Sequence, residues 1–398
     1  MLSHQRASLA FYDLQRLYRT LSDNTPIQLI DALVDILCDK FISKENRQLL
    51  QIAFCPELEQ ATLDAFMSCW DIEKMTSDKA LLLAYVMKKR PDLDFGAYNG
   101  PRLKGLLSYY RFQNLNLISH FSKIVTALNK KNIVPMILKG GAMKYLCPDL
   151  PRAMGDIDIL VDSPKSYNLA KETVKELGYT YNEEPHSIDV HLRSDPDKGI
   201  LDIHQFLGFD FCSHPLFIKD VFQRAKINNI FKAETYLPTH EDLFFICLNN
   251  ISQNIKISTS IQGLPFAFFD LFYLSNTKKH FDWNIVFHNI FAINANVQSY
   301  IAAKFINKII PDFIPQPFFE NKKIISNVCN AIYMDKFYTL YVHDVKLACK
   351  KLKIKEALKN KDSLKTYVKF KTQHFFTKRI VKSPLLSKLF LRLLQKGV

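Results

Sequence analysis

Length, composition and charge exclude several classes of protein. The chain has 398 residues, which is too long for a single compact core, and its 48% hydrophobic and 23% charged residues are typical of a globular protein. No apolar run reaches the roughly 18 residues that a transmembrane helix needs, and the residues after Met1 lack the charged-then-apolar pattern of a secretory signal. We therefore expect a cytoplasmic protein with no transmembrane segment.

The first part of the chain is patterned as helices. Apolar residues recur near helical spacing in 9–21 and 27–37, and an Asn-Thr-Pro sequence interrupts them at 24–26. The stretch from Arg90 to Pro101 is rich in turn-forming residues, so we place a boundary there. The sequence thus predicts an N-terminal helical region over 1–100.

A long helix and a buried strand come next. An apolar stripe predicts the helix over 103–130, and the apolar run at 133–138 predicts the strand, with Pro135 at a strand start or edge. Two adjacent glycines, Gly140 and Gly141, then stand out in a chain that has only 11 glycines. A glycine-poor sequence that places two side by side needs them there. A short helix is predicted to follow over 142–146.

Two aspartates lie on the next predicted strand, which covers 156–161. Side chains at alternate positions share a face, so Asp156 and Asp158 project together while the isoleucines between them face the core. Two carboxylates this close repel each other unless a cation relieves the repulsion. Mg²⁺ prefers carboxylate, water and phosphate oxygens, and paired ions suit an in-line displacement. We therefore predict a site for Mg²⁺, or Mn²⁺, at this pair.

The glycines and two cations predict a phosphate-binding segment. Gly140 and Gly141 let the backbone approach a triphosphate, and the helix that follows offers N–H donors to an anion. Lys139 and Arg152 could neutralise phosphate charge, and the planar guanidinium group of Arg152 suits phosphate. The alternative for each is a structural ion pair, for Arg152 with Asp149 or Asp156.

A small α/β unit between two helical regions completes the pattern. A helix is predicted over 163–177, two strands over 186–192 and 200–207 with a turn at 193–199, and helical patterning returns from about residue 239. We predict an α+β fold, with a small mixed-sheet core over 101–237 and a C-terminal helical region over 238–398.

A third carboxylate is expected on a neighbouring strand. The two later strands each carry an Asp-x-His sequence, Asp189 with His191 and Asp202 with His204. Either aspartate could bind a metal and help to deprotonate an acceptor hydroxyl. His204 is interpreted as a structural histidine or as a support for Asp202.

The C-terminal tail carries nearly all of the net charge of +14. Residues 341–398 hold 16 Lys and Arg against 3 Asp and Glu, a net charge of +13. The segment 384–396 has leucines on one face and cations opposite, which fits an amphipathic helix on an anionic membrane surface. The lysines of 346–382 could instead contact nucleic-acid phosphates. The plainest alternative is a helix that packs its leucines on the body of the protein.

Taken in order, these motifs resemble a known superfamily. Lys139-Gly140-Gly141, Arg152 and the Asp-x-Asp-x-Leu-Val sequence from Asp156 are similar to the polymerase-beta-like nucleotidyltransferases. More narrowly, they resemble the uncharacterised bacterial nucleotidyltransferase family with a Leu-Lys-Gly…Arg…Asp-x-Asp-x-Leu-Val signature. In that family a later acidic residue, followed two positions on by His, ends the core, so the resemblance favours Asp202 over Asp189. It covers roughly residues 105–275.

The resemblance implies a metal-dependent, ATP-binding or other NTP-binding transferase. Such an enzyme moves a nucleoside monophosphate from an NTP to an acceptor hydroxyl, of a protein, an RNA or a small molecule, by a two-Mg²⁺ in-line mechanism that releases pyrophosphate. The alternative is a non-catalytic nucleotide-binding or scaffold protein that retains the fold. The implied catalytic and metal-binding residues are Asp156, Asp158 and Asp202, and the implied nucleotide-binding residues are Lys139, Gly140, Gly141 and Arg152.

Overall fold

The structure is a computed structural model that describes most of the chain between residues 30 and 333. The described residues are 30–31, 34–35, 37–38, 42–55, 57–148, 152–183, 187–207, 215–257, 264–276, 280–293 and 295–333. Apart from Lys256 and Ile257, they all belong to one compact unit, Met1–Ile255 with Ser260–Lys336. The whole basic tail, 341–398, and with it both interpretations of the tail, lies outside the described residues.

Within the described residues, strands form one mixed sheet in the order β3-β4-β5-β2-β1-β7-β6. The strands are β1 (Met136–Ile137), β2 (Ile157–Leu160), β3 (Thr180–Glu183), β4 (Ser187–Leu192), β5 (Asp195–His204), β6 (Lys226–Ile230) and β7 (Ala233–Leu237). The pairs β2–β5 and β1–β7 are parallel, and the other neighbours are antiparallel. The expected α+β class with a mixed sheet is confirmed.

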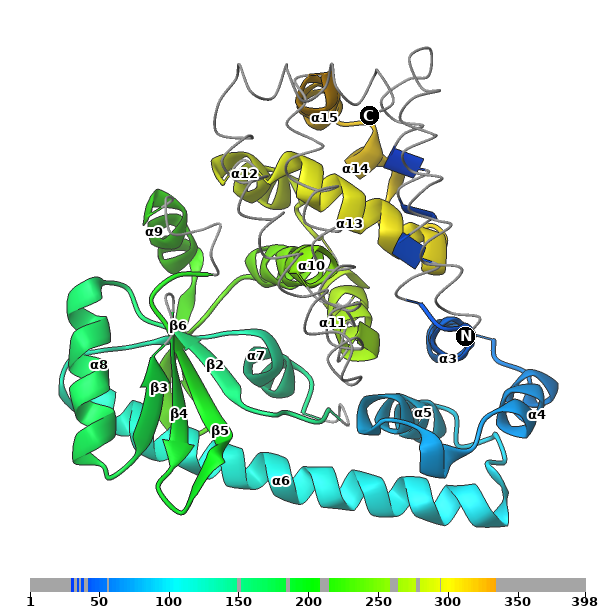
Figure 1. Ribbon diagram of the computed structural model, residues 1–398, viewed down its shortest axis with the longest axis horizontal. Coiled ribbons are helices and arrows are strands. Elements are labelled where there is room, and N and C mark those ends of the chain that lie inside the picture. The colour runs from blue at the N-terminus through cyan, green and yellow to red at the C-terminus, as the bar shows by residue number, and fades with distance from the viewer. Residues whose placement is uncertain are drawn as a thin grey trace, which may run out of the picture. The chain divides into compact units, whose positions relative to one another are not determined.

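Helices precede, cover and follow this sheet (Figure 1). Before it come α3 (Lys44–Phe54), α4 (Gln60–Cys69), the short 3-10 helix η2 (Ile72–Lys74), α5 (Ser77–Lys89) and α6 (Gly96–Lys130). Between its strands lie α7 (Lys139–Leu146), α8 (Pro164–Glu176) and α9 (Pro215–Arg224). After it come α10 (His240–Ile257), α11 (Leu264–Asn276), α12 (Trp283–Ala292), α13 (Asn296–Ile309), α14 (Gln316–Phe319) and α15 (Lys322–Tyr333). The predicted domain limits at 100 and 237 remain a prediction.

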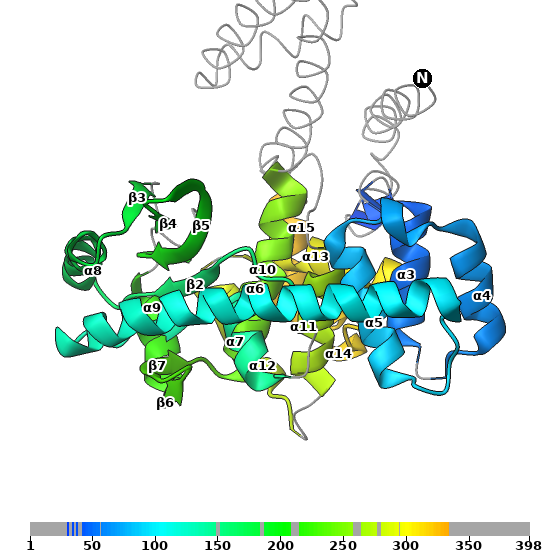
Figure 2. The same cartoon turned by 90° about the horizontal axis from the view of Figure 1, so that it is seen from below.

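Helix α6 is longer than expected. It spans 35 residues and includes Pro101, so the stretch predicted to form turns is helical from Gly96 onward. One face of the helix is buried through Leu103, Leu117 and Phe121, and it contacts α5 at one end and strands β2, β5 and β7 along the other. Figure 2 shows α6 running from the N-terminal helices α4 and α5 to the sheet. Burial of this long apolar face outweighs the local cost of a proline near the helix start.

Local sequence signals predict the ends of several other helices and strands correctly. Helix α8 begins after Ser163, whose hydroxyl accepts a hydrogen bond from the Ser166 N–H at 3.2 Å, and Gly178 follows it with a φ of 84°. The strand predicted at 186–192 is β4. The predicted turn at 193–199 is wrong beyond Ser194, because β5 already begins at Asp195.

Three strands had no counterpart among the predicted elements. They are β3 and the hairpin of β6 with β7. The turn of that hairpin consists of Phe231 and Lys232, with φ values of 51° and 67°. Left-handed turns of this kind are usually marked by Asn or Gly, so the sequence carries no hairpin signal here.

Among the described helices, none combines the length and the hydropathy that a transmembrane span requires. The described cysteines are free thiols. Cys38 and Cys247 are buried, whereas Cys55 and Cys69 are exposed.

Candidate active site

Two parallel strands bring two of the predicted carboxylates together. Strand β2 pairs with β5 in a register that sets Asp158 beside Asp202 and Leu160 beside His204. Side chains of directly paired residues leave the sheet on the same face, about 4.8 Å apart at the backbone. Asp158 is only 8% exposed. The register therefore concentrates negative charge at a partly buried point of the sheet.

His204 lies between these two carboxylates. Its Nε2 atom is 2.9 Å from Asp158 Oδ1 and 3.1 Å from Asp202 Oδ2. One ligand atom from each of the three residues lies within 4.8 Å of the others, so the trio could hold a metal ion. Burial alone lowers the pKa of His204, but hydrogen bonds to Asp158 and Asp202 outweigh burial and raise it. His204 therefore belongs to the site, although the sequence indicated only a supporting or structural role.

Lys139 supplies a positive charge to the same carboxylate. It is the first residue of α7, and its Nζ atom lies 2.5 Å from Asp158 Oδ1. Burial opposes ionisation of Asp158, yet the charge of Lys139 and the hydrogen bond from His204 hold the pKa of Asp158 well below its usual range. Lys139 has a left-handed φ of 40°, which costs roughly 1 kcal/mol for a residue with a side chain. Such local strain is typical of functional sites.

Asp156 lies in a bend directly before β2. Part of its side chain is exposed, but reduced hydration among the surrounding protein atoms and the charge of Asp158 raise its pKa above the usual range, against the opposing effect of Lys139. The charge of Asp202 also contributes to the rise. Asp156 thus shares an electrostatic environment with the other two predicted carboxylates.

The alternative third carboxylate, Asp189, lies one strand farther away. Strand β4 pairs with β5 so that Asp189 is opposite Asp202, not beside Asp158. Asp189 Oδ2 is 3.2 Å from His191 Nε2, and a Cβ atom at Gly199 would come within 2.6 Å of Asp189 Oδ1. Position in the sheet is therefore consistent with the preference for Asp202.

The two adjacent glycines have different neighbours. A Cβ atom at Gly140 would lie 3.0 Å from Arg152 Nε, so the guanidinium group occupies the space that a side chain would need. A Cβ atom at Gly141 would lie 2.8 Å from Ile157 Cγ2 and 2.9 Å from Ile137 Cδ1. Gly141 is thus required for close packing of α7 on the sheet, while Gly140 borders the predicted phosphate-binding arginine.

We expect Gly141→Ala to destabilise the protein by about 1–3 kcal/mol, because the new methyl group would overlap two buried isoleucines. Gly155→Ala is the matched control, since a Cβ atom there would meet nothing within 4 Å. Urea unfolding of the two variants measures the difference. Equal midpoints for Gly141→Ala and wild type would show that α7 does not pack as described.

Arg152 is held by residues that the sequence did not indicate. Its Nη1 atom donates to Asp270 Oδ1 on α11, and its guanidinium carbon lies 5.5 Å from the centre of the Phe266 ring. Asn114 of α6 donates from Nδ2 to the Arg152 carbonyl oxygen at 2.5 Å and accepts from the Met154 N–H at 3.2 Å. The expected ion pair of Arg152 thus exists, but the partner the structure shows is Asp270.

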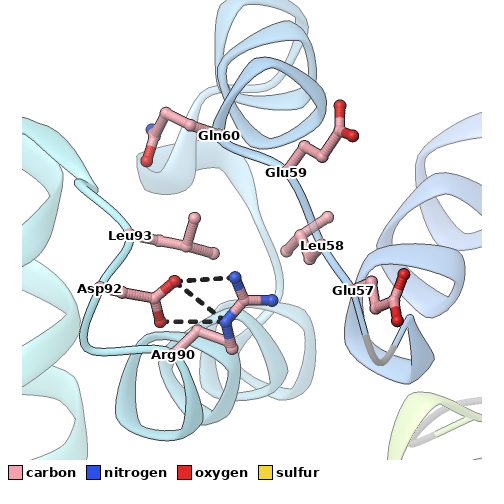
Figure 3. A pocket seen from close by; sticks show the side chains of 7 residues that line it. All are labelled: Glu57, Leu58, Glu59, Gln60, Arg90, Asp92 and Leu93. Carbon is pink, nitrogen blue, oxygen red and sulfur yellow. Dashed lines mark hydrogen bonds and ion pairs between the residues drawn. The ribbon is translucent and has the colours of Figure 1, made fainter.

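A separate pocket lies among the N-terminal helices (Figure 3). It is lined by Glu57, Leu58, Glu59, Gln60, Arg90, Asp92 and Leu93. Its lining cation, Arg90, is already paired with Asp92, with Nη2 and Oδ2 2.8 Å apart. The remaining charged lining residues are acidic, so this pocket is unsuited to a triphosphate.

The class of this protein follows from a match to a family model. The model of the family described as uncharacterised nucleotidyltransferases matches residues 82–311, more than half of the chain. The protein belongs to this family, and the expected superfamily resemblance is confirmed. Its membership supports an enzyme that transfers nucleotidyl groups.

Other comparisons are more distant. No curated protein matches the sequence. Among solved structures, the antibiotic-resistance factor ANT(2'')-Ia in solution is 12% identical, with a TM-score of 0.33, 46% of this chain and 92% of that chain covered. An antigenic nucleotidyltransferase-like protein from Paracoccidioides brasiliensis is 13% identical, with a TM-score of 0.28, 58% and 92% covered. Because these scores are low, the functional conclusion depends on the family match and on the site itself.

Proposed function

We propose that the protein moves a nucleoside monophosphate from an NTP to an acceptor hydroxyl and releases pyrophosphate. One observation carries this proposal: Asp158 and Asp202 lie side by side on parallel strands, and Lys139 forms an ion pair with Asp158. Nothing in the packing of a sheet requires two adjacent carboxylates, and their repulsion costs stability unless nearby cations neutralise it.

The residues present fit a divalent cation. Asp202 Oδ1 is buried, and no group in the described part of the chain donates a hydrogen bond to it. A buried acceptor of this kind needs a ligand or a water molecule. Asp156, Asp158 and Asp202 offer the carboxylate oxygens that Mg²⁺ and Mn²⁺ prefer, with His204 as a support for two of them. Two such ions would stabilise the attacking and leaving oxygens of an in-line displacement.

The protein's own groups would bind and orient the reactants. Lys139 and Arg152 would neutralise the triphosphate, and Asp202 would accept the proton of the acceptor hydroxyl. The acceptor oxygen then forms a bond to the α-phosphorus, and the bond from that phosphorus to the bridging oxygen breaks as pyrophosphate leaves. Holding the two reactants in line lowers the barrier by several kcal/mol.

The acceptor could be a protein, an RNA or a small molecule. The excess of cations in 341–398 favours a macromolecule, because such a segment attracts polyanions. Incubation of a cell lysate with the protein and NTPs labelled at the α-phosphate identifies the acceptor as the species that becomes labelled.

A non-catalytic nucleotide-binding or scaffold role is the second candidate. One observation favours it: Asp158 is already neutralised by Lys139 and His204, so the site is partly satisfied without a cation. Calorimetry followed by an assay for pyrophosphate separates the two functions. For an enzyme we expect ATP to bind at least about tenfold more weakly after Mg²⁺ is chelated, because its phosphate charge is then unscreened at the carboxylates. Binding that ignores Mg²⁺, with no pyrophosphate released, would favour the scaffold.

A further inference from the structure

The guanidinium group of Arg152 is confined by groups from distant parts of the chain. Its Nη1 atom is paired with Asp270, which is 2% exposed, and the Phe266 ring lies four residues earlier on the same helix, α11. On another side, Gly140 leaves room for the Nε atom. The direction of the Arg152 side chain is therefore set by α7 and α11 together.

The backbone of Arg152 is fixed independently of these contacts. Asn114, which is 3% exposed in the middle of α6, hydrogen-bonds the Arg152 carbonyl oxygen and the Met154 N–H. Loss of the Asp270 carboxylate would therefore leave the loop in place and release only the side chain. An experiment can therefore distinguish orientation of the Arg152 side chain by Asp270 from support of the loop backbone by Asn114.

The charge and hydrogen bonding of the pair point to a ligand. A buried carboxylate beside an anion-binding arginine lowers the local positive charge, so it is unfavourable for phosphate binding unless it serves orientation. Guanidinium has five donors, so Asp270 on Nη1 leaves the Nε–Nη2 edge available for a second, bidentate acceptor. The Nε atom is buried and has no hydrogen-bond acceptor among the described residues.

We propose that Asp270 is a positioning residue that holds the Nε–Nη2 edge of Arg152 toward the triphosphate of a bound NTP. This inference rests on the proposed function, since it assumes that an NTP binds beside α7. Helix α11, in the predicted C-terminal helical region, would then contribute a residue to the nucleotide-binding site.

A double-mutant cycle tests this role by calorimetric titration with Mg²⁺-ATP. We expect Asp270→Asn to weaken ATP binding about tenfold and Arg152→Ala to weaken it by at least as much. The double variant should bind within about twofold of Arg152→Ala alone, because Asp270 acts only through Arg152. AMP, which lacks the outer phosphates, should lose much less affinity in every variant. Asp270→Glu keeps the charge and should recover part of the loss.

The outcomes separate the two proposals. Additive losses in the double variant, or tighter ATP binding by Asp270→Asn as expected from removal of a negative charge alone, would overturn the positioning role. Wild-type protein that binds none of the four common Mg²⁺-NTPs would overturn the proposed function, and this inference with it. Asp220→Asn, on an exposed part of α9, is the control for charge and should bind ATP like wild type. Thermal unfolding confirms that each variant is folded. If Asp270→Asn does not fold, the ATP affinity of Asp270→Glu tests the positioning role instead.

Discussion

Asp158→Asn is expected to reduce nucleotidyl transfer by roughly 10³-fold or more while the protein stays folded. The substitution keeps the shape of the side chain but removes the charge that would stabilise bound cations and orient Lys139. The fold should persist because the backbone contact of this residue, from the Leu138 N–H to the Asp158 carbonyl oxygen at 2.9 Å, is unchanged. Release of pyrophosphate from an NTP in the presence of Mg²⁺ measures the effect.

The matched control is Asp162→Asn. Asp162 follows the same strand, is exposed and accepts a hydrogen bond from the Ser166 hydroxyl at 2.7 Å, away from the paired carboxylates. It should retain nearly full activity. If Asp158→Asn were as active as wild type, the assignment of this carboxylate to the reaction would be wrong, whatever the acceptor.

Arg224→Ala is expected to destabilise the helical region after the sheet by roughly 3–5 kcal/mol, because it leaves a buried carboxylate without its cation. Asp242 is fully buried, and Arg224 donates to it from Nη2 at 2.6 Å and from Nε at 3.1 Å. Thr239 and Asn289 donate to the same carboxylate at 2.8 and 2.9 Å. This network joins α9, α10 and α12, so urea unfolding should show a lower midpoint for the variant.

An exposed pair on two of the same helices provides the comparison. Asp220 and His288 lie 3.3 Å apart at the surface, so Asp220→Asn should change stability by less than about 0.5 kcal/mol. Arg224→Lys keeps a positive charge but loses the bidentate hydrogen bonding to Asp242. Its loss of stability should therefore fall between those of Arg224→Ala and Asp220→Asn. A midpoint for Arg224→Ala equal to that of wild type would mean that the network contributes no net stability.

Several features of the fold could be predicted because their causes are local. The limits of α8 follow from a capping serine and a glycine with positive φ. The alternation from Asp156 to Val161 predicts a strand, which the structure forms as β2, but Asp156 itself lies in a bend before that strand. By contrast, the Phe-Lys turn of the β6–β7 hairpin carries no turn signal, and the Asn-Gly-Pro sequence at 99–101 carries one that the packing of α6 overrides.

Taken alone, the amino-acid order determined the class of the fold and the strand that carries Asp158, because side-chain alternation depends only on neighbouring residues. Which later aspartate lies beside Asp158 depended on strand order, since β5 and not β4 is the parallel neighbour of β2. The pairing of Arg152 with Asp270, 118 residues away, was likewise decided only when α11 packed near α7. Contacts of this separation depend on how whole elements pack, and no local pattern encodes that arrangement.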